Sequence, residues 1–165
     1  HATASPSMDI QISSNFERLL FEAFDRDPAK VRAAMESLKQ SGSFGIEKKA
    51  LQAITKSFRA GRASEKQVAE TIKSVLSATG YLLDPHSAIG VFVAAKHEKP
   101  RAPMVTLATA HPAKFPLAVE RACGINPPLP SWLADLMDRE ERFDVLDADI
   151  KTVESFIAER ARVGH

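Results

Sequence analysis

Polar side chains stand at three points where an apolar segment gives way to a helical pattern. These points are Ser13-Ser14-Asn15, Asp84-Pro85-His86-Ser87 and Thr109-Ala110-His111. Each group precedes a predicted helix N-terminus, whose free N–H groups and positive dipole end favour an anion such as phosphate. The same residue types also cap helices, so a single group is weak support for a site. Three groups at one edge of a parallel sheet would form a ligand site.

Two further side chains could react, and both also have structural interpretations. His111 could act as a general base, but no Ser or Asp partner stands at a recognisable spacing, which favours a structural role. Cys123 ends a predicted helix, where the helix dipole does not favour a thiolate, and we interpret it as a buried packing residue. Neither zinc-type His/Glu spacing nor a glycine-rich phosphate loop occurs, so we expect no metal site.

Composition limits the class of protein. The chain has 165 residues, of which 44% are hydrophobic and 26% charged, as in a single globular domain. Its net charge of +1 provides no field that would attract nucleic acid or an anionic membrane. The longest apolar stretch, about 88–95, is far shorter than the roughly 20 residues that cross a bilayer. With a single cysteine, the chain fits a cytoplasmic location, without a nucleic-acid or membrane partner.

The hydrophobic pattern predicts an α/β fold. Segments 8–13, 80–84 and 103–109 read as strands, and a helical pattern follows each of them. This order predicts a small, mostly parallel sheet flanked by helices. Three helical patterns between about 28 and 79 read as a helical insertion between strands.

Local signals predict where the helices begin. Ser14 with Glu17, and Ser64 with Gln67, match the S-x-x-E/Q capping box. Asp27-Pro28 reads as an N-cap followed by proline at the first helical position. Further helices are expected from Pro85, from Pro112 or Pro116, after Ser131 and from Ile150.

Four blocks of sequence resemble a known family. They are SPSMDIQISSNFERLLFE, GYLLDPHSAIGV, VTLATAHPAKFPLAVE and LPSWLADLMDREERF. Together they resemble the C-terminal part of threonine synthase, a pyridoxal-phosphate enzyme with a tryptophan-synthase-β-like fold. SSNFERLLFE combined with LATAHPAKF is specific, whereas DPHSA is generic for this enzyme class. The resemblance implies that residues 1–165 are the C-terminal part of the cofactor-binding large domain of a longer enzyme.

The resemblance also implies a reaction and a cofactor contact. The expected reaction converts O-phospho-L-homoserine and water to L-threonine and phosphate. Thr109 is similar to the family's serine or threonine that hydrogen-bonds the pyridine nitrogen of pyridoxal 5'-phosphate. A neutral hydroxyl can donate to an unprotonated nitrogen, which makes the ring a weaker electron sink than a carboxylate would and suits phosphate elimination. His86 and Ser87 are expected to line the cofactor edge.

The family's Schiff-base lysine and glycine-rich phosphate loop lie in its N-terminal part. No catalytic residue is therefore expected in residues 1–165, and Lys114 reads as an exposed first-turn residue. The expected partner is the N-terminal part of the same chain. Without it we expect no activity, together with exposed sheet edges and self-association.

Substrate contacts are inferred from position. Ser14, Asn15 and Arg18 could bind the substrate phosphate at a helix N-terminus, where a guanidinium offers a planar fork, although Arg18 could equally serve as an ion-pair partner. Two other functions remain open at this point. One is another lyase of the same cofactor class, and the other is a non-catalytic α/β module that binds a phosphorylated small molecule.

Overall fold

The structure is a computed structural model that describes residues 2–97 and 102–162. The chain divides into two compact units, His1–Pro128 and Leu129–His165. The first unit contains the helices α1 (Ser14–Ala23), α2 (Pro28–Ser41), α3 (Lys48–Thr55), α4 (Glu65–Thr79), α5 (Pro85–Ala95) and α6 (Pro116–Cys123), with the 3-10 turns η1 (Pro6–Met8) and η2 (Pro112–Lys114). The second contains the 3-10 turns η3 (Ser131–Leu133) and η4 (Leu136–Asp138), followed by helix α7 (Ile150–Arg160).

The predicted parallel sheet was wrong, because residues 2–97 and 102–162 contain helices and loops but no strand. A strand is stable only when a neighbouring strand receives its backbone hydrogen bonds, and segments 8–13, 80–84 and 103–109 do not pair with one another. The alternating apolar pattern was present in the sequence. Within this chain, however, no described segment provides the partner that the pattern requires.

Segment 80–84 is too short to be a strand, because both of its ends belong to helix caps. Gly80 is the C-cap of α4 with φ +74°, and Asp84 is the N-cap of α5. Only three residues remain between these caps, and Leu83 among them is buried. The segment is therefore a tight connection between two packed helices.

The other two segments expose their apolar side chains. Ile10 and Ile12 are 61% and 69% exposed, and Val105 and Leu107 are 77% and 75% exposed. In segment 8–13, Met8 belongs to η1, and the Asp9 carboxylate accepts hydrogen bonds from Thr3 and closes a loop over residues 3–9. Both segments have the composition of strands but pair with no other described segment.

Most helix boundaries follow the local signals. The Asp27 carboxylate accepts from the backbone N–H groups of Ala29 and Lys30, as expected of the cap of α2. A complete capping box joins Ser64 and Gln67 at the start of α4. The capping box expected between Ser14 and Glu17 was wrong, because Ser14 is the first residue of α1. The N-cap is Ser13, and its side chain makes no capping hydrogen bond.

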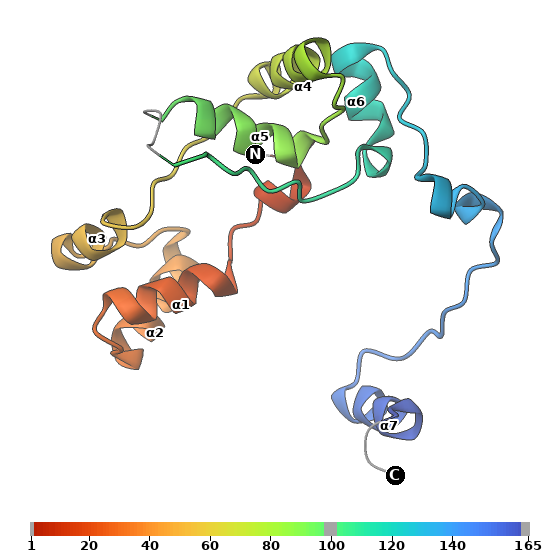
Figure 1. Ribbon diagram of the computed structural model, residues 1–165. Helices are drawn as coiled ribbons and strands as arrows, with labels where there is room; N and C mark the ends of the chain where they lie inside the picture. The colour runs from red at the N-terminus through yellow and green to blue at the C-terminus, as the bar shows by residue number, and fades with distance from the viewer. Residues whose placement is uncertain (1, 98–101, 163–165) are drawn as a thin grey trace. The chain divides into compact units, whose positions relative to one another are not determined.

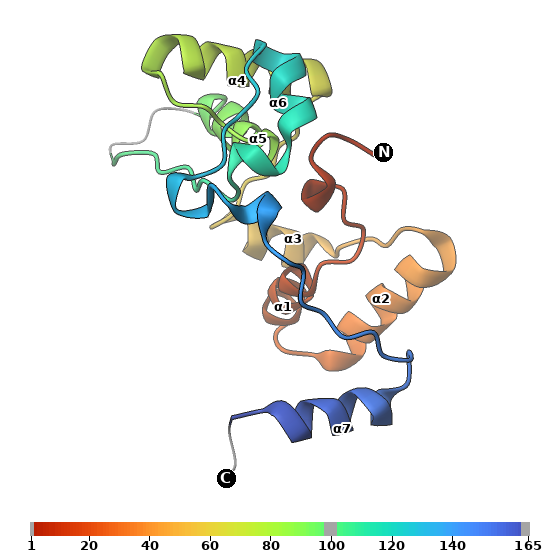
Figure 2. The ribbon, with the colours of Figure 1, turned by 90° about the vertical axis from the view of Figure 1, so that its right-hand side faces the viewer.

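The helices of the first unit pack in two groups. Helices α1, α2 and α3 enclose a small core that contains Leu20, Phe24, Ala34 and Ala50. Helix α4 packs on α5 and α6 around a second core that contains Val68, Ile72, Leu83 and Ala88. Both views of the ribbon show α4, α5 and α6 close together, with α1, α2 and α3 forming the other group (Figure 1, Figure 2). The predicted insertion at 28–79 thus includes α4, which belongs to the second core, and its status as an insertion stays a prediction.

A glycine brings segment 102–109 close to α5. A Cβ added at Gly90 would lie 3.0 Å from the Thr106 methyl carbon, which is tighter than an ordinary contact. Glycine is unfavourable inside a helix by roughly 1 kcal/mol relative to alanine. Its presence at position 90 is explained by this close approach.

The second unit has little core. Its described residues, 129–162, include no buried side chain, and Trp132 and Phe143 are 75% and 74% exposed. Asp149 caps α7 by accepting from the Thr152 backbone N–H at 2.9 Å. In neither unit does a described helix have the length and apolar character needed to cross a membrane.

Candidate functional site

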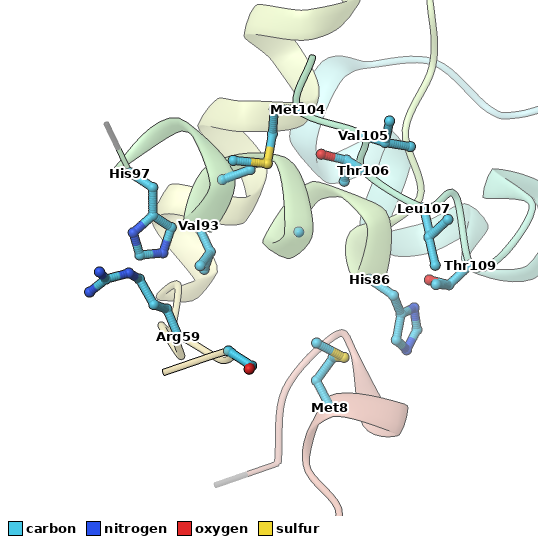
Figure 3. A pocket seen from close by; sticks show the side chains of 13 residues that line it. Met8, Arg59, His86, Val93, His97, Met104, Val105, Thr106, Leu107 and Thr109 are labelled. Atoms are coloured by element: carbon cyan, nitrogen blue, oxygen red, sulfur yellow. The ribbon is translucent and has the colours of Figure 1, made fainter. Parts of the chain in front are cut away.

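A cavity of about 710 Å³ lies along α5 in the first unit. Helix α5 forms one side and segment 104–109 another, while η1 and the α3–α4 connection contribute a few residues (Figure 3). The lining surface is mostly apolar. The polar and charged ones are Ser57, Arg59, His86, His97, Thr106 and Thr109.

Thr109 is an exposed residue in the wall of this cavity. Its backbone N–H donates to the Ser87 hydroxyl oxygen at 3.1 Å, which ties the end of segment 103–109 to the first turn of α5. Figure 3 shows the Thr109 side chain near the His86 ring. Within the described part of the chain, the Thr109 hydroxyl has no hydrogen-bond partner, so it is free to donate to a ligand in the cavity.

His86 is 5% exposed and held on three sides. Its Nδ1 lies 3.0 Å from the Asp84 carboxylate, and its Nε2 accepts from the Ser7 backbone N–H at 3.3 Å. The Phe115 ring packs against the imidazole with ring centroids 4.5 Å apart. Because Nε2 is an acceptor, the ring hydrogen resides on Nδ1 and is donated to Asp84.

Ser87 is 2% exposed and connects Asp84 with Thr109. Its hydroxyl donates to the Asp84 carboxylate and accepts from the Thr109 N–H. Asp84 itself is 1% exposed and caps α5 by accepting from the His86 and Ser87 backbone N–H groups. The residues predicted at the cofactor edge, His86, Ser87 and Thr109, are therefore brought together by one buried carboxylate.

A guanidinium and a second histidine line another part of the same cavity. Arg59, from the α3–α4 connection, and His97, just beyond α5, are drawn at the end away from Thr109 (Figure 3). A guanidinium at the rim suits an anionic group such as phosphate.

The residues predicted to bind substrate lie elsewhere in the chain. Ser14, Asn15 and Arg18 are exposed on the first turns of α1, and they are not among the residues that line the cavity. The structure thus does not bring them to Thr109. Their predicted role in binding phosphate stays a prediction.

The remaining candidate residues have structural contacts. His111 caps η2 by accepting from the Ala113 N–H at 3.2 Å, and Lys114 is exposed. Cys123 is half-buried, and its thiol lies 3.2 Å from the Val119 carbonyl oxygen. No three His, Cys, Asp or Glu side chains within 2–97 and 102–162 are placed to hold a metal ion.

Sequence reasoning named Asp84 only as a member of one polar group, without its bonds to His86 and Ser87. It missed two lining residues, Arg59, which adds charge, and Met8, which reaches the cavity from η1. The Asp-Pro pair that identified Asp27 as a cap could have identified Asp84 in the same way. Arg59 and Met8 are far from α5 in sequence, and no local signal marks them.

Comparison with known proteins identifies relatives over the whole chain. Residues 87–157 match the family model described as "Threonine synthase, C-terminal". Threonine synthase of Pseudomonas aeruginosa is 45% identical over 99% of this chain, and that of Methylobacillus glycogenes is 37% identical over 95%. The chain spans 35% and 34% of the lengths of these two relatives.

Solved structures give the same result. The pyridoxal-phosphate-bound threonine synthase of Brucella melitensis matches with 60% identity and a TM-score of 0.83, over 98% of this chain and 35% of that one. Yeast threonine synthase matches with 34% identity and a TM-score of 0.74, over 96% of this chain and 36% of that one. The chain therefore belongs to the threonine synthase family and corresponds to the C-terminal third of its relatives.

Proposed function

We propose that this chain forms one wall of the active site of a threonine synthase, which converts O-phospho-L-homoserine and water to L-threonine and phosphate. The observation that carries the proposal is the 60% identity over 98% of the chain to a threonine synthase with bound pyridoxal phosphate. The alternatives of a non-catalytic module and of another lyase of this class are not favoured. The full-length bacterial and yeast relatives reported above are all threonine synthases.

The chemistry of the cavity fits pyridoxal 5'-phosphate. Thr109 presents a neutral hydroxyl without a protein partner in the described chain, and the walls around it are mostly apolar. When bound, the cofactor supplies an electron-withdrawing ring that stabilises negative charge on the substrate carbon. Thr109 would donate a hydrogen bond to the ring nitrogen without adding a charge there. His86 and Ser87 would hold the cavity wall on which Thr109 stands.

The proposed substrate contacts are of two kinds. Ser14, Asn15 and Arg18 are the residues inferred from sequence for the phosphate group, and they lie on the first turns of α1. Arg59 lies in the cavity itself and offers the same planar, bidentate geometry to phosphate oxygens.

The rest of the enzyme is the proposed partner. The relatives are about three times as long as this chain, which spans 35% of their length. We propose that the additional polypeptide carries the lysine and the phosphate loop that bind the cofactor, and that residues 1–165 form the C-terminal part of the same large domain. Residues 1–165 alone would then bind the cofactor weakly and show no turnover. A cytoplasmic location stays a prediction from the single cysteine, Cys123.

The test uses the full-length protein that contains this sequence. We expect purified protein with pyridoxal 5'-phosphate to form L-threonine and inorganic phosphate in equal amounts from O-phospho-L-homoserine. Inorganic phosphate is measured with molybdate and threonine by chromatography. A protein that instead released ammonia from serine or threonine would be a dehydratase, and this result would contradict the proposal.

A further inference from the structure

Asp84 makes more hydrogen bonds than a helix cap requires. Its carboxylate accepts from the His86 backbone N–H at 2.8 Å and from the Ser87 backbone N–H at 3.3 Å. It also accepts from the His86 Nδ1–H at 3.0 Å and from the Ser87 hydroxyl. A carboxylate that is 1% exposed is costly to bury, and these four donors offset that cost.

A second Asp-Pro cap in the same chain shows what capping alone needs. Asp27 precedes Pro28 as Asp84 precedes Pro85, and it accepts from two backbone N–H groups, at 2.9 and 3.3 Å. No side-chain donor is recorded for Asp27 among the described residues. The two side-chain bonds of Asp84 are thus additional to its function as a cap.

One of these additional bonds determines how Ser87 meets Thr109. A serine hydroxyl has a single hydrogen, and that of Ser87 is donated to Asp84. The lone pairs of the Ser87 oxygen are then left to accept the Thr109 N–H at 3.1 Å. Without an acceptor at position 84, the hydroxyl could turn its hydrogen toward Thr109, and the contact between the two residues would be lost.

The other additional bond determines the orientation of His86. Because Nδ1 donates to Asp84, Nε2 remains an acceptor and receives the Ser7 N–H at 3.3 Å. This bond joins the residues before α1 to the start of α5, beside Met8 in the cavity lining.

We propose that Asp84 is a positioning residue of the active site: through Ser87 it holds the Thr109 backbone, and with it the Thr109 hydroxyl, in the cavity wall. The effect on catalysis rests on the proposed threonine synthase function. The effect on the Thr109 backbone does not, because it depends only on the hydrogen bonds described above.

The test is Asp84→Asn in the full-length protein, with Asp27→Asn as its matched control. Asparagine caps helices about as well as aspartate, so both variants keep their helix starts. With its amide oxygen in the capping position that accepts the His86 N–H, the asparagine NH₂ group faces the Ser87 hydroxyl and cannot accept its hydrogen. Asp84→Asn therefore breaks the Ser87 bond, whereas Asp27→Asn has no such bond to lose. The first measurement is amide hydrogen exchange, followed by mass spectrometry, on peptides covering residues 103–111 and α2. The second is kcat and KM for threonine formation.

We expect Asp84→Asn to speed exchange in the 103–111 peptide on the order of tenfold, with the α2 peptide unchanged. We expect kcat to fall on the order of tenfold with KM nearly constant. The substitution would displace the proposed contact of Thr109 to the cofactor and leave the substrate contacts in place. Asp27→Asn should leave exchange at 103–111 and kcat within about twofold of the unmodified protein. Unchanged exchange at 103–111 in Asp84→Asn, or the same response in both variants, would overturn the proposal.

If Asp84→Asn does not fold, Ser87→Ala decides the question. It removes the hydroxyl that donates to Asp84 and accepts the Thr109 N–H, and Ser74→Ala on the exposed side of α4 is its control. Faster exchange at 103–111 in Ser87→Ala, but not in Ser74→Ala, would support the proposal, and equal exchange in both would overturn it. If the unmodified protein makes no threonine, the proposed function fails, while the exchange measurement still tests Asp84 independently.

Discussion

Thr109 carries the proposed contact to the cofactor, and valine at this position would keep the shape of the side chain while removing its hydroxyl. In the full-length protein we expect Thr109→Val to retain cofactor absorbance and to lower kcat about tenfold, since a single hydrogen bond is lost. Thr55→Val, at the end of α3 and outside the cavity lining, is the control. Unchanged kcat in Thr109→Val would remove this residue from the site.

Asp149 provides a pH-dependent contact in the second unit. Hydrogen bonds from the Thr152 backbone N–H and then from the Thr152 hydroxyl lower the pKa of Asp149 below its ordinary value of 3.8. Because the folded-state pKa is depressed, the capping contribution is complete above pH 3.8 and is lost as pH falls through the lower folded-state value.

We expect the Thr152 amide resonance to shift in an acid titration followed by NMR, with a midpoint below 3.8. Asp149→Asn should keep the cap but remove the titration, because an amide oxygen accepts the same bond without a charge. A midpoint at or above 3.8 in the unmodified protein would show that the hydrogen bonds do not favour the ionised carboxylate.

How far the sequence predicts the site depends on how local each contact is. His86 and Ser87 are adjacent, and Thr109 was placed with them on the resemblance of the TAHPAKF block to the family; the three lie together around Asp84. Arg59 enters the cavity through tertiary packing, which no spacing in the sequence indicates. The sheet edge that was expected to unite Ser14 with Thr109 is not formed within residues 2–97 and 102–162, and Ser14 does not line the cavity of Thr109.

Among elements, the helix starts allow a direct comparison of two serine caps. Ser64 accepts from the Gln67 N–H in a complete capping box, whereas Ser13, the N-cap of α1, makes no side-chain capping bond. We expect Ser64→Ala to lower the free energy of unfolding by about 1 kcal/mol and Ser13→Ala to change it by only a few tenths. Urea unfolding followed by circular dichroism measures both. Equal losses would show that the capping box contributes nothing specific.

The helices were predictable because their signals lie within a few residues of each other. Asp27-Pro28, Ser64 with Gln67, and Pro116 each mark a boundary that the structure has. The absence of strands could not be predicted in this way. Alternating apolar and polar residues indicate that one segment could be a strand, but they do not show whether another segment is available to pair with it. At 103–109 the alternating side chains are present but the pairing is not.

For the whole molecule, the exposed apolar segments predict association of residues 1–165 when they are produced alone. Val105 and Leu107 are 77% and 75% exposed in a segment whose backbone pairs with no other segment that the structure describes. Such a run offers unpaired N–H and C=O groups beside apolar side chains, which favours pairing with another chain.

We expect light scattering to show dimers or larger species, and Val105→Lys with Leu107→Lys to reduce them severalfold, because charged side chains oppose edge pairing. Ala33→Lys with Ala53→Lys adds the same charge at exposed helical positions and is the control. A monomer at all concentrations, or equal reduction by both pairs of substitutions, would contradict this expectation.

The close contact of Gly90 with Thr106 makes position 90 a means of adjusting the cavity from its helical side. A methyl group there would press on the Thr106 methyl carbon, which lies 3.0 Å from the place a Cβ would occupy. Segment 104–109 would have to lift away from α5 by a few tenths of an ångström, which would widen the space in front of Thr109. Alanine or serine at this position would therefore enlarge the cavity available to the proposed substrate and leave its existing polar groups in place.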